Sequence, residues 1–533
     1  MREIRTATGR KQPLYVDAGG RSLFGFYHPP RAGAWRGVGV VLCNPIGTDQ
    51  TRSDRTYRHL AEQLAAAGFA CLRFDLFATG DSGGGELEAG YVGAWLDDIE
   101  AACVALRRRS GADAIALVGL RLGASLAMTL AAEREGVDSL VLWNPCISGP
   151  SFVADVTKLH KLYTRIEPHL ALAPPPRSEG EEALGLFLPR GLIEDLSRID
   201  LLRTARRPAS RTLVIDGGNL PGRDALMGRL REIGAAPELR THPGHKFLVT
   251  VSHRALVPQE VLDSIVGWLV DAYPATVAEQ AAAPGPLAPS PSGERVLVFG
   301  EKHPLFGILT PADPARAKPG RPAILLSNAG CVNRAGPHRT YVKMARRWAQ
   351  LGFDVLRVDL SGIGDSPAAP GVEENVNYPP SALDDLGEAM TAVGAGRVIV
   401  AGLCSGGDYA FQLGIHEARV AAAWILNPRT FCVLALAAVE SGAPPTAPVD
   451  AVPQHLREMA ARGVDTMLVV SRNDPGVAYV DAHATDEMRS LAAVPGFRRV
   501  DVDGADHSFT PVALQERVSD LLTERLIALH PAS

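Results

Sequence analysis

An internal repeat constrains this chain more than any other feature of its sequence. The triplet Arg-Thr-Tyr at 55–57 recurs at 339–341, which is 284 residues later (339 less 55). Gly-Asp-Ser at 80–82 recurs at 364–366 with the same spacing. Over about ninety residues this spacing changes by a single residue, which chance does not produce. The chain is therefore a tandem duplication, and each half is expected to fold as a copy of one unit.

Length and composition are those of a globular protein with several domains. The 533 residues exceed the ~100–200 of a usual domain, and 46% of them are hydrophobic against 21% charged, so sizeable cores can form. The net charge is −5 and no basic stripe occurs, which argues against nucleic acid as a partner. No apolar run reaches the ~18 residues of a membrane span, and Met1 opens no leader-like segment. We expect neither a membrane partner nor a signal peptide.

The cysteines are scattered, without the close pairs of metal sites or disulfide frameworks. They stand at positions 43, 71, 103, 146, 331, 404 and 432. This distribution is typical of free thiols in a reducing compartment, so it predicts a cytoplasmic protein. We expect no cofactor and no metal.

A stretch rich in Ala and Pro marks the boundary between the two copies. Residues 276–292 lack any apolar period, as in a semi-stiff linker. The predicted domains are therefore 1–275 and 293–533.

Each half alternates short apolar runs with longer amphipathic ones. In the second half, buried strands are expected at 323–328, 354–360, 397–403, 421–427 and 466–471. In the first half, they are expected at 39–44, 70–76, 115–120, 139–144 and 212–216. Continuous apolar strands separated by helices indicate a mostly parallel sheet that is covered on both faces. The predicted fold class is α/β, with two such domains in tandem.

A tight strand-to-helix turn in the second half carries a nucleophile. The strand at 397–403 leads into Gly402-Leu403-Cys404-Ser405-Gly406, and a helical stretch follows at 409–414. Residues without Cβ atoms permit such a turn, which lifts the middle side chain above the sheet. The N-terminus of the following helix favours a thiolate and a developing oxyanion.

This turn resembles the nucleophile elbow of α/β-hydrolases. The chain is similar to the serine aminopeptidase S33 and dienelactone-hydrolase-like members, and the latter carry Cys at this position. The resemblance implies an α/β-hydrolase domain in each half, with a small cap insertion. It also implies the chain order nucleophile, acid, histidine. Asp474 follows the strand at 466–471, and His507 lies in a Gly-acid-His-Ser-Phe loop after the short strand at 498–502.

The resemblance assigns a role to each of these residues. Cys404 would attack the carbonyl carbon, His507 would accept and return its proton, and Asp474 would orient the imidazole. Asp506 is an alternative orienting acid, although neighbours in sequence rarely face each other. The oxyanion hole would combine the N–H of Ser405 with that of Ala329 or Gly330, because those two residues follow the first long strand.

The first half has lost this chemistry. Arg121 stands at the elbow position, and a guanidinium that stays protonated cannot attack a carbonyl. Leu220 stands at the acid position, while His245 is retained and Asp216 offers a substitute acid. We expect Arg121 to pair with a carboxylate such as Asp75 or Asp81, or else to bind an anion. Such Arg-bearing elbows are similar to those of exosortase-associated hydrolase-like proteins.

Both halves carry a cap insertion between later strands. The cap of the first half is long, at 146–211, with helices expected at 152–163 and 192–202. The cap of the second half is shorter, at 429–465, with helices expected at 431–439 and 456–461. A short cap favours an open pocket and a carrier-bound substrate.

The leading interpretation is a Cys-dependent acyl-transfer enzyme that cleaves an ester or thioester, as a hydrolase or acyltransferase in a bacterial biosynthetic pathway. Its expected partner is a small-molecule or carrier-bound acyl substrate, with the two domains packed together and a homo-oligomer as an option. One alternative is a non-catalytic binding or scaffold protein, since fold alone does not imply activity. A lyase or isomerase without covalent chemistry is the other.

Overall fold

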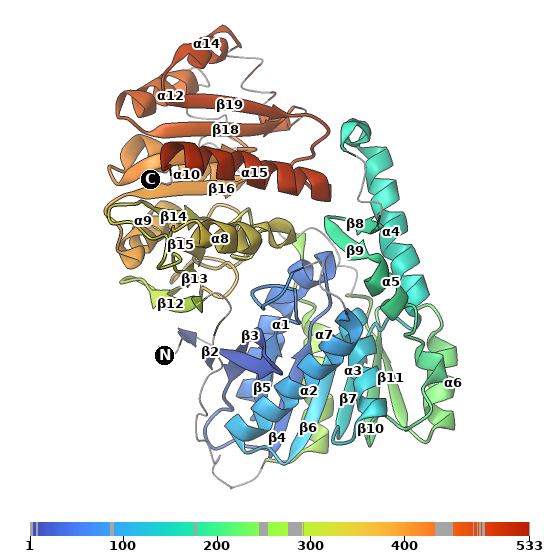
Figure 1. The fold of residues 1–533 in the computed structure, drawn as a ribbon. Helices are drawn as coiled ribbons and strands as arrows, with labels where there is room; N and C mark the ends of the chain where they lie inside the picture. The colour runs from blue at the N-terminus through green and yellow to red at the C-terminus, as the bar shows by residue number, and fades with distance from the viewer. Residues whose placement is uncertain are drawn as a thin grey trace. The chain divides into compact units, whose positions relative to one another are not determined.

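The structure is a computed structural model. It describes residues 4–6, 9–85, 90–174, 179–244, 254–275, 290, 293–431, 451–472, 474–476, 478, 481 and 485–531. The chain forms two compact units (Figure 1). Unit 1 comprises residues 1–159, 178–183 and 187–291, and unit 2 comprises residues 160–177, 184–186 and 292–533. Except for Ser290, the expected linker at 276–292 lies outside the described residues.

Unit 1 is built on a nine-stranded sheet in the order β1-β2-β3-β5-β4-β6-β7-β10-β11. The strands of this sheet are β1 (Ile4–Thr6), β2 (Gly9–Ala18), β3 (Arg21–His28), β4 (Val38–Cys43), β5 (Ala70–Phe74), β6 (Ala114–Leu120), β7 (Ser139–Trp143), β10 (Arg211–Asp216) and β11 (Pro237–Thr241). The six strands from β5 to β11 in this order are parallel, and β1 to β3 are antiparallel.

The first part of the chain also forms helices and a small hairpin. The helices are α1 (Thr48–Ala66), α2 (Tyr91–Ser110), α3 (Leu122–Glu133), α4 (Gly149–Ile166), α5 (Arg190–Leu196), α6 (Arg223–Glu232) and α7 (Gln259–Ala272), with 3-10 turns η1 (Pro168–Leu172) and η2 (Leu201–Arg203). The hairpin pairs β8 (Gly180–Ala183) with β9 (Leu186–Pro189). Side chains of α1 and α7 pack in one apolar cluster with alternate residues of the sheet, so these two helices cover the same face.

Unit 2 contains an eight-stranded sheet in the order β12-β13-β15-β14-β16-β17-β18-β19. Its strands are β12 (Arg295–Phe299), β13 (Leu305–Thr310), β14 (Ala323–Leu326), β15 (Val355–Asp359), β16 (Val398–Leu403), β17 (Val420–Leu426), β18 (Asp465–Ser471) and β19 (Phe497–Val502). Its helices are α8 (Thr340–Gln350), α9 (Ala382–Val393), α10 (Ser405–His416), α12 (Ala451–Ala461), α14 (Thr485–Ser490) and α15 (Val512–Leu529), with 3-10 turns η6 (Pro337–Arg339) and η7 (Leu491–Ala493). Only β12 and β13 run antiparallel to their neighbours in this sheet.

Continuous apolar strands account for a core on each face of the unit 2 sheet. Along β16, Val398 and Val400 pack with α9 and α10, whereas Ile399 and Ala401 pack with α8 and α15. Because successive side chains of a strand point to opposite faces, a strand buried on both sides must be apolar throughout. The prediction of two tandem α/β domains with mostly parallel sheets is confirmed.

The structure differs from one local prediction, and a second lies outside the described residues. The helix expected at 192–202 is interrupted: α5 ends at Leu196, and the Asp200 side chain accepts a hydrogen bond from the N–H of Leu202 and starts the separate turn η2. This side-chain acceptor offers the backbone an alternative to a continuous helix. The helix expected at 431–439 lies outside the described residues, apart from Phe431.

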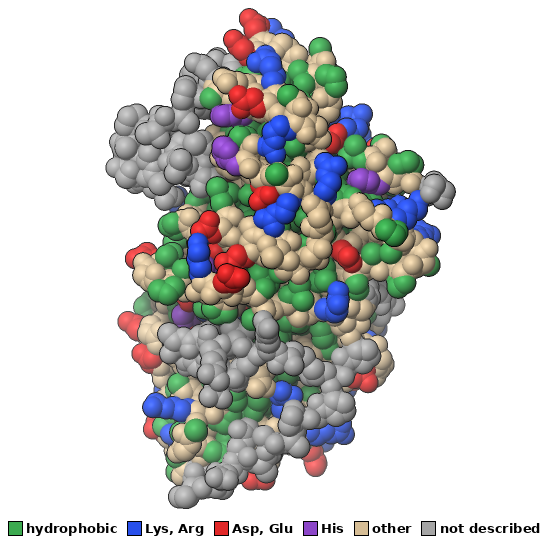
Figure 2. Space-filling view, turned by 90° about the vertical axis from the view of Figure 1, so that its left-hand side faces the viewer, with side chains coloured by type: hydrophobic (Ala, Val, Ile, Leu, Met, Phe, Trp, Pro, Cys, Tyr) green, Lys and Arg blue, Asp and Glu red, His purple; other side chains and the backbone are tan. Residues whose placement is uncertain are grey.

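The surface carries mixed charge. On the face shown in Figure 2, acidic and basic side chains of the described residues are interspersed. In the part of the chain that the structure describes, no helix is long and apolar enough to cross a bilayer.

Candidate active site

The topology of unit 2 gathers the predicted site residues at one edge of the sheet. The chain passes from β14 to β15 on one side and then crosses to β16 on the other, so the strand order reverses between β14 and β16. Open α/β sheets bind ligands at the carboxyl ends of the strands at such a point. Cys404 directly follows β16, and Ala329 lies a few residues beyond β14.

The backbone at Cys404 is strained. Its φ and ψ are 60° and −122°, in a region that residues with a Cβ atom avoid. The flanking glycines allow the turn to pack tightly: a Cβ on Gly402 would lie 2.5 Å from the Gly406 carbonyl carbon, and one on Gly406 would lie 2.8 Å from the Asn328 oxygen. The predicted elbow is therefore present as a strained, closely packed turn at the start of α10.

His507 and Asp474 are in direct contact. His507 Nδ1 and Asp474 Oδ2 lie 2.5 Å apart, and Asp474 is buried. The other carboxylate oxygen, Oδ1, accepts a hydrogen bond of 3.0 Å from the N–H of Gly476. One oxygen thus fixes the turn after β18 while the other holds the imidazole, as an orienting acid requires.

The imidazole of His507 is partly buried and interacts with Cys404. Burial lowers the pKa of His507. The hydrogen bond with Asp474 and the interaction with Cys404 outweigh this effect and raise the pKa to about 10. Its Nε2 atom is buried and makes no hydrogen bond of standard geometry with the described residues, although Cys404 is close enough to affect the pKa of the ring. The structure brings the predicted cysteine, histidine and acid together.

Asp506 does not contact the imidazole. Its Oδ1 accepts the N–H of Thr510 at 2.6 Å, and its Oδ2 accepts the hydroxyls of Thr510 and Tyr163 at 2.5 and 2.7 Å. The carbonyl oxygen of Asp506 accepts a hydrogen bond from the Ser471 hydroxyl. These contacts anchor the loop that carries His507. Asp506 therefore does not occupy the position of an acid that orients the imidazole.

The two candidate oxyanion donors after β14 differ in availability. The N–H of Gly330 donates to Ser405 Oγ at 2.9 Å and is therefore engaged. Within the described residues, the N–H groups of Ala329 and Ser405 have no hydrogen-bond partner, and the first N–H groups of a helix are unsatisfied by the helix itself. The choice that the sequence left open between Ala329 and Gly330 thus favours Ala329.

A buried carboxylate behind the elbow was not anticipated. Asp408, one helical turn after Cys404, accepts the Tyr378 hydroxyl at 2.7 Å and the N–H of Phe431 at 2.8 Å. Burial raises the pKa of Asp408 to about 6, against the lowering effect of these hydrogen bonds. The only signal in the sequence is an acidic residue in the first turn of an otherwise apolar helix.

The corresponding turn of unit 1 keeps the shape of the elbow. Arg121 has φ and ψ of 54° and −123°, and its Nε lies 3.4 Å from Asp49 Oδ2. Burial lowers the pKa of Arg121, but the nearby Cys146 and Asp49 raise it overall, which favours the charged form. Arg121 therefore pairs with a carboxylate, as expected, but the partner is Asp49.

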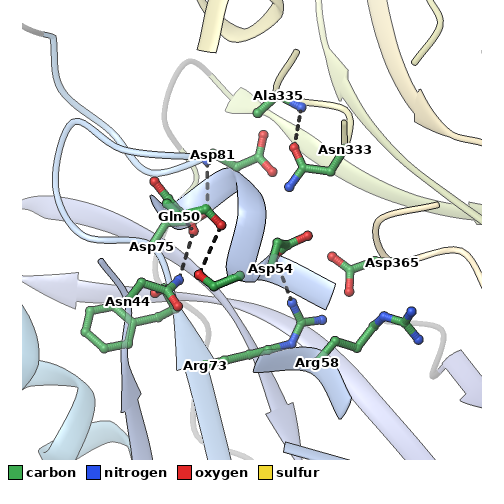
Figure 3. Close-up of polar contacts among 12 residues, drawn as sticks. Asn44, Gln50, Asp54, Arg58, Arg73, Asp75, Asp81, Asn333, Ala335 and Asp365 are labelled. Carbon is green, nitrogen blue, oxygen red and sulfur yellow. Dashed lines mark hydrogen bonds and ion pairs between the residues drawn. The ribbon is translucent and has the colours of Figure 1, made fainter. Parts of the chain in front are cut away.

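The two carboxylates proposed from the sequence have other environments. Asp75 Oδ1 accepts the side-chain amide of Gln50 at 2.8 Å and that of Asn44 at 3.5 Å (Figure 3). Its Oδ2 accepts the N–H of Asp81 at 2.9 Å, so both Asp75 and Asp81 belong to the loop after β5. Sequence alone could not separate Asp49 from these residues because the pairing depends on where α1 begins.

The remaining positions of the unit 1 site lack the triad pattern. Leu220 is buried, and its N–H donates at 3.0 Å to Asp216, which also accepts Arg223 Nη1. Asp216 thus holds the turn after β10. The residue that corresponds to Ala329 is Pro45, which has no N–H to donate. His245 lies outside the described residues.

Among the described residues, no group of three His, Cys, Asp or Glu side chains is arranged to hold a metal ion.

Comparisons with known proteins point toward hydrolases. Residues 51–200 match the family described as Serine aminopeptidase, S33, and these residues lie largely in unit 1, around Arg121. A comparison with the curated proteins found no match.

Several solved structures are similar to about half of the chain. Est1E from Butyrivibrio proteoclasticus, solved with ferulic acid bound, is 17% identical over 48% of this chain and 98% of its own, with a TM-score of 0.37. XC6422 from Xanthomonas campestris, an α/β serine hydrolase without a lid, is 15% identical over 52% and 100%, with a TM-score of 0.32. Proline iminopeptidase from Mycobacterium smegmatis is 13% identical over 49% and 98%, with a TM-score of 0.36.

Proposed function

We propose that unit 2 is an acyl-transfer hydrolase that cleaves an ester or thioester through a covalent intermediate on Cys404. One observation carries the proposal. A cysteine in a strained elbow lies at the same sheet edge as a histidine whose Nδ1 is 2.5 Å from a buried aspartate. This is the arrangement of nucleophile, base and orienting acid on which acyl transfer depends.

The proposed reaction begins with the thiolate of Cys404. The raised pKa of His507, about 10, supports an imidazolium at this position at neutral pH. The sulfur attacks the carbonyl carbon and a C–S bond forms. The negative charge that develops on the carbonyl oxygen is accepted by the N–H groups of Ser405 and Ala329.

His507 then completes the first half of the reaction. It donates its proton to the leaving oxygen or sulfur as the bond from the carbonyl carbon to that atom breaks, which leaves an acyl thioester on Cys404. In the second half, His507 accepts a proton from water or from another acceptor, which attacks the acyl-enzyme. Asp474 holds the ring in one orientation throughout. The identity of this acceptor separates a hydrolase from an acyltransferase.

Unit 1 is proposed to be catalytically inert. Its elbow presents Arg121, its acid position is Leu220, and Pro45 removes one oxyanion donor. The similarity of residues 51–200 to a peptidase family therefore concerns the half without the nucleophile.

A mechanism-based acyl probe tests the proposal. The full chain is incubated with an acyl donor, such as a p-nitrophenyl ester or an acyl thioester, and the acylated residue is located by mass spectrometry. We expect acylation at Cys404 and turnover that Cys404→Ala abolishes. Cys331→Ala is the matched control, because Cys331 is the other half-exposed thiol among the described residues. Turnover retained by Cys404→Ala, or acylation only at Cys331, would refute the covalent mechanism.

A further inference from the structure

Three large apolar side chains are exposed within a short segment of unit 2. Leu162, Ile166 and Leu172 are exposed by 51%, 65% and 71%. Among the described residues of this unit, Ile527 is the one other exposed large apolar side chain, and its exposed fraction is 47%. Single exposed apolar residues are common, but a group of three within 11 residues calls for a partner.

These side chains belong to a segment that lies beside the catalytic histidine loop. The segment, residues 160–174, is called the cap segment here; it precedes β12 in sequence yet clusters with unit 2. Tyr163 donates a hydrogen bond of 2.7 Å to Asp506, the neighbour of His507. At the other end, a Cβ on Gly504 would lie 2.4 Å from the nitrogen of Ala173, so the two backbones are in close contact.

Helical geometry directs the apolar side chains toward the same region. Successive residues of a helix are rotated by ~100°, so Leu162 and Ile166 point within about 100° of the direction of Tyr163. The exposed stripe, which consists of Leu162 and Ile166 of α4 and Leu172 of η1, therefore belongs to a segment that contacts the histidine loop near both of its ends. Ala173 packs against the apolar cluster that Cys404 also contacts.

We infer that the cap segment binds the apolar acyl chain of the substrate, which names the substrate class of the proposed function and rests on it. From Leu162 to Ile166 the helix rises about 6 Å, the length of a short to medium acyl chain. A second copy of the chain fits less well, because three side chains cannot supply the ~800 Å² per partner of a stable interface. The substrate is accordingly an ester or thioester of a medium-chain fatty acid rather than of acetic acid.

Chain-length selectivity in the full-length protein provides the test. We expect kcat/KM to rise from acetyl to octanoyl thioesters by two- to fourfold per methylene, since a fully buried CH₂ contributes ~0.8 kcal/mol. The double variant Ile166→Ser/Leu172→Ser should lose at least about tenfold on the octanoyl substrate and less than twofold on the acetyl one. Ile527→Ser is the matched control, because this exposed side chain lies on α15, and it should keep the wild-type profile.

A pair of glycine variants tests the cap without changing any apolar residue. Gly504→Ala drives a Cβ into Ala173, whereas Gly496→Ala, also at positive φ, meets nothing closer than 3.8 Å. We expect only Gly504→Ala to reduce the octanoyl-to-acetyl ratio. Equal ratios in both variants would overturn the inference.

Binding separates this inference from the proposed function. In Cys404→Ala, which cannot form an acyl-enzyme, calorimetry should give tighter binding for octanoyl than for acetyl thioester, and Ile166→Ser should remove the difference. A chain labelled at Cys404 whose kcat/KM and affinity ignore chain length would overturn the inference and leave the function standing. Chain-length-dependent binding without any turnover would do the reverse. Binding of the stripe to neutral lipid vesicles, with no effect of acyl length, would also overturn it.

Discussion

The two elbows share their backbone but not their chemistry. Arg121 and Cys404 have nearly the same dihedral angles, 54° and −123° against 60° and −122°. The glycines of unit 1 are packed as tightly: a Cβ on Gly119 would lie 2.4 Å from Ala124, and one on Gly123 would lie 2.2 Å from the Cys43 oxygen. The strained turn is therefore maintained by the packing of strand against helix, whether or not a nucleophile occupies it.

What differs is the set of groups that surrounds the turn. Asp408 of unit 2 corresponds to Ser125 of unit 1, whose hydroxyl donates to the Cys146 oxygen at 2.6 Å. Ala329 likewise corresponds to Pro45. The geometry of the elbow is therefore common to both units, while the groups around it differ.

The largest expected effect concerns His507 and Asp474, since the first half has Leu220 at the position that corresponds to the acid. His507→Ala and Asp474→Asn should each lower kcat/KM by at least ~100-fold, because the members of a triad act as a unit. Asp506→Asn is the matched control, since this carboxylate contacts Thr510 and Tyr163 instead of the imidazole. Steady-state kinetics on one acyl thioester decide the matter. A greater loss in Asp506→Asn than in Asp474→Asn would show that the orienting acid is misassigned.

The next effect is a pH dependence that follows from the pKa of His507, about 10. Above that pH the imidazolium is lost, so turnover of a thioester with a poor leaving group should fall about tenfold per pH unit. Alkylation by iodoacetamide requires only the thiolate and should not fall. Because the pKa in the folded protein exceeds the ~6.5 of an unfolded histidine, the same contacts stabilise the fold fully below pH 6.5 and cease to do so as pH rises through 10.

The pH profile of turnover also tests whether Arg121 of unit 1 affects the titration of His507. Arg121→Ala should leave the fall in turnover at high pH unchanged. The rate measured with Cys404→Ala is subtracted as the background of spontaneous hydrolysis. A fall that moves to another pH in Arg121→Ala would show that Arg121 affects the titration of the unit 2 site.

A transplant asks whether the side chains alone make the difference. In a Cys404→Ala background, Arg121→Cys/Leu220→Asp should give no measurable turnover, because Pro45 leaves the oxyanion with one donor fewer. Pro45→Ala is the added change that restores an N–H, so any recovery should occur only in the triple variant. Turnover by the double variant would contradict the role assigned to Pro45.

Sequence reasoning recovered the features that depend on local pattern. The glycine spacing predicted the turn around Cys404, and the apolar runs predicted the parallel strands, because both depend on residues adjacent in the chain. The antiparallel strands β2, β3, β12 and β13 were not anticipated. For β12 the reason is that Arg295–Phe299 is short and only partly buried.

Features that depend on distant residues could not be predicted. The contact of Tyr163 with Asp506 joins positions 343 residues apart, and no pattern in the sequence relates them. The engagement of the Gly330 N–H by Ser405 depends on how two loops approach each other. The pairing of Arg121 with Asp49 likewise requires the position of the first turn of α1. These contacts are set by tertiary packing.

The smallest expected effect measures the strain that the two elbows share. At positive φ, glycine avoids the penalty that a Cβ atom incurs, so Arg121→Gly should be more stable than Arg121→Ala by about 1 kcal/mol, or ~2–4 °C in the Tm of its unit. Loss of the half-exposed ion pair with Asp49 is common to both variants and contributes at most ~1 kcal/mol. Cys404→Gly against Cys404→Ala forms the matched pair in unit 2, and we expect the same difference there. If calorimetry of the full chain gave a difference at Cys404 but none at Arg121, unit 1 would have relaxed its elbow, and the shared backbone geometry would no longer imply shared strain.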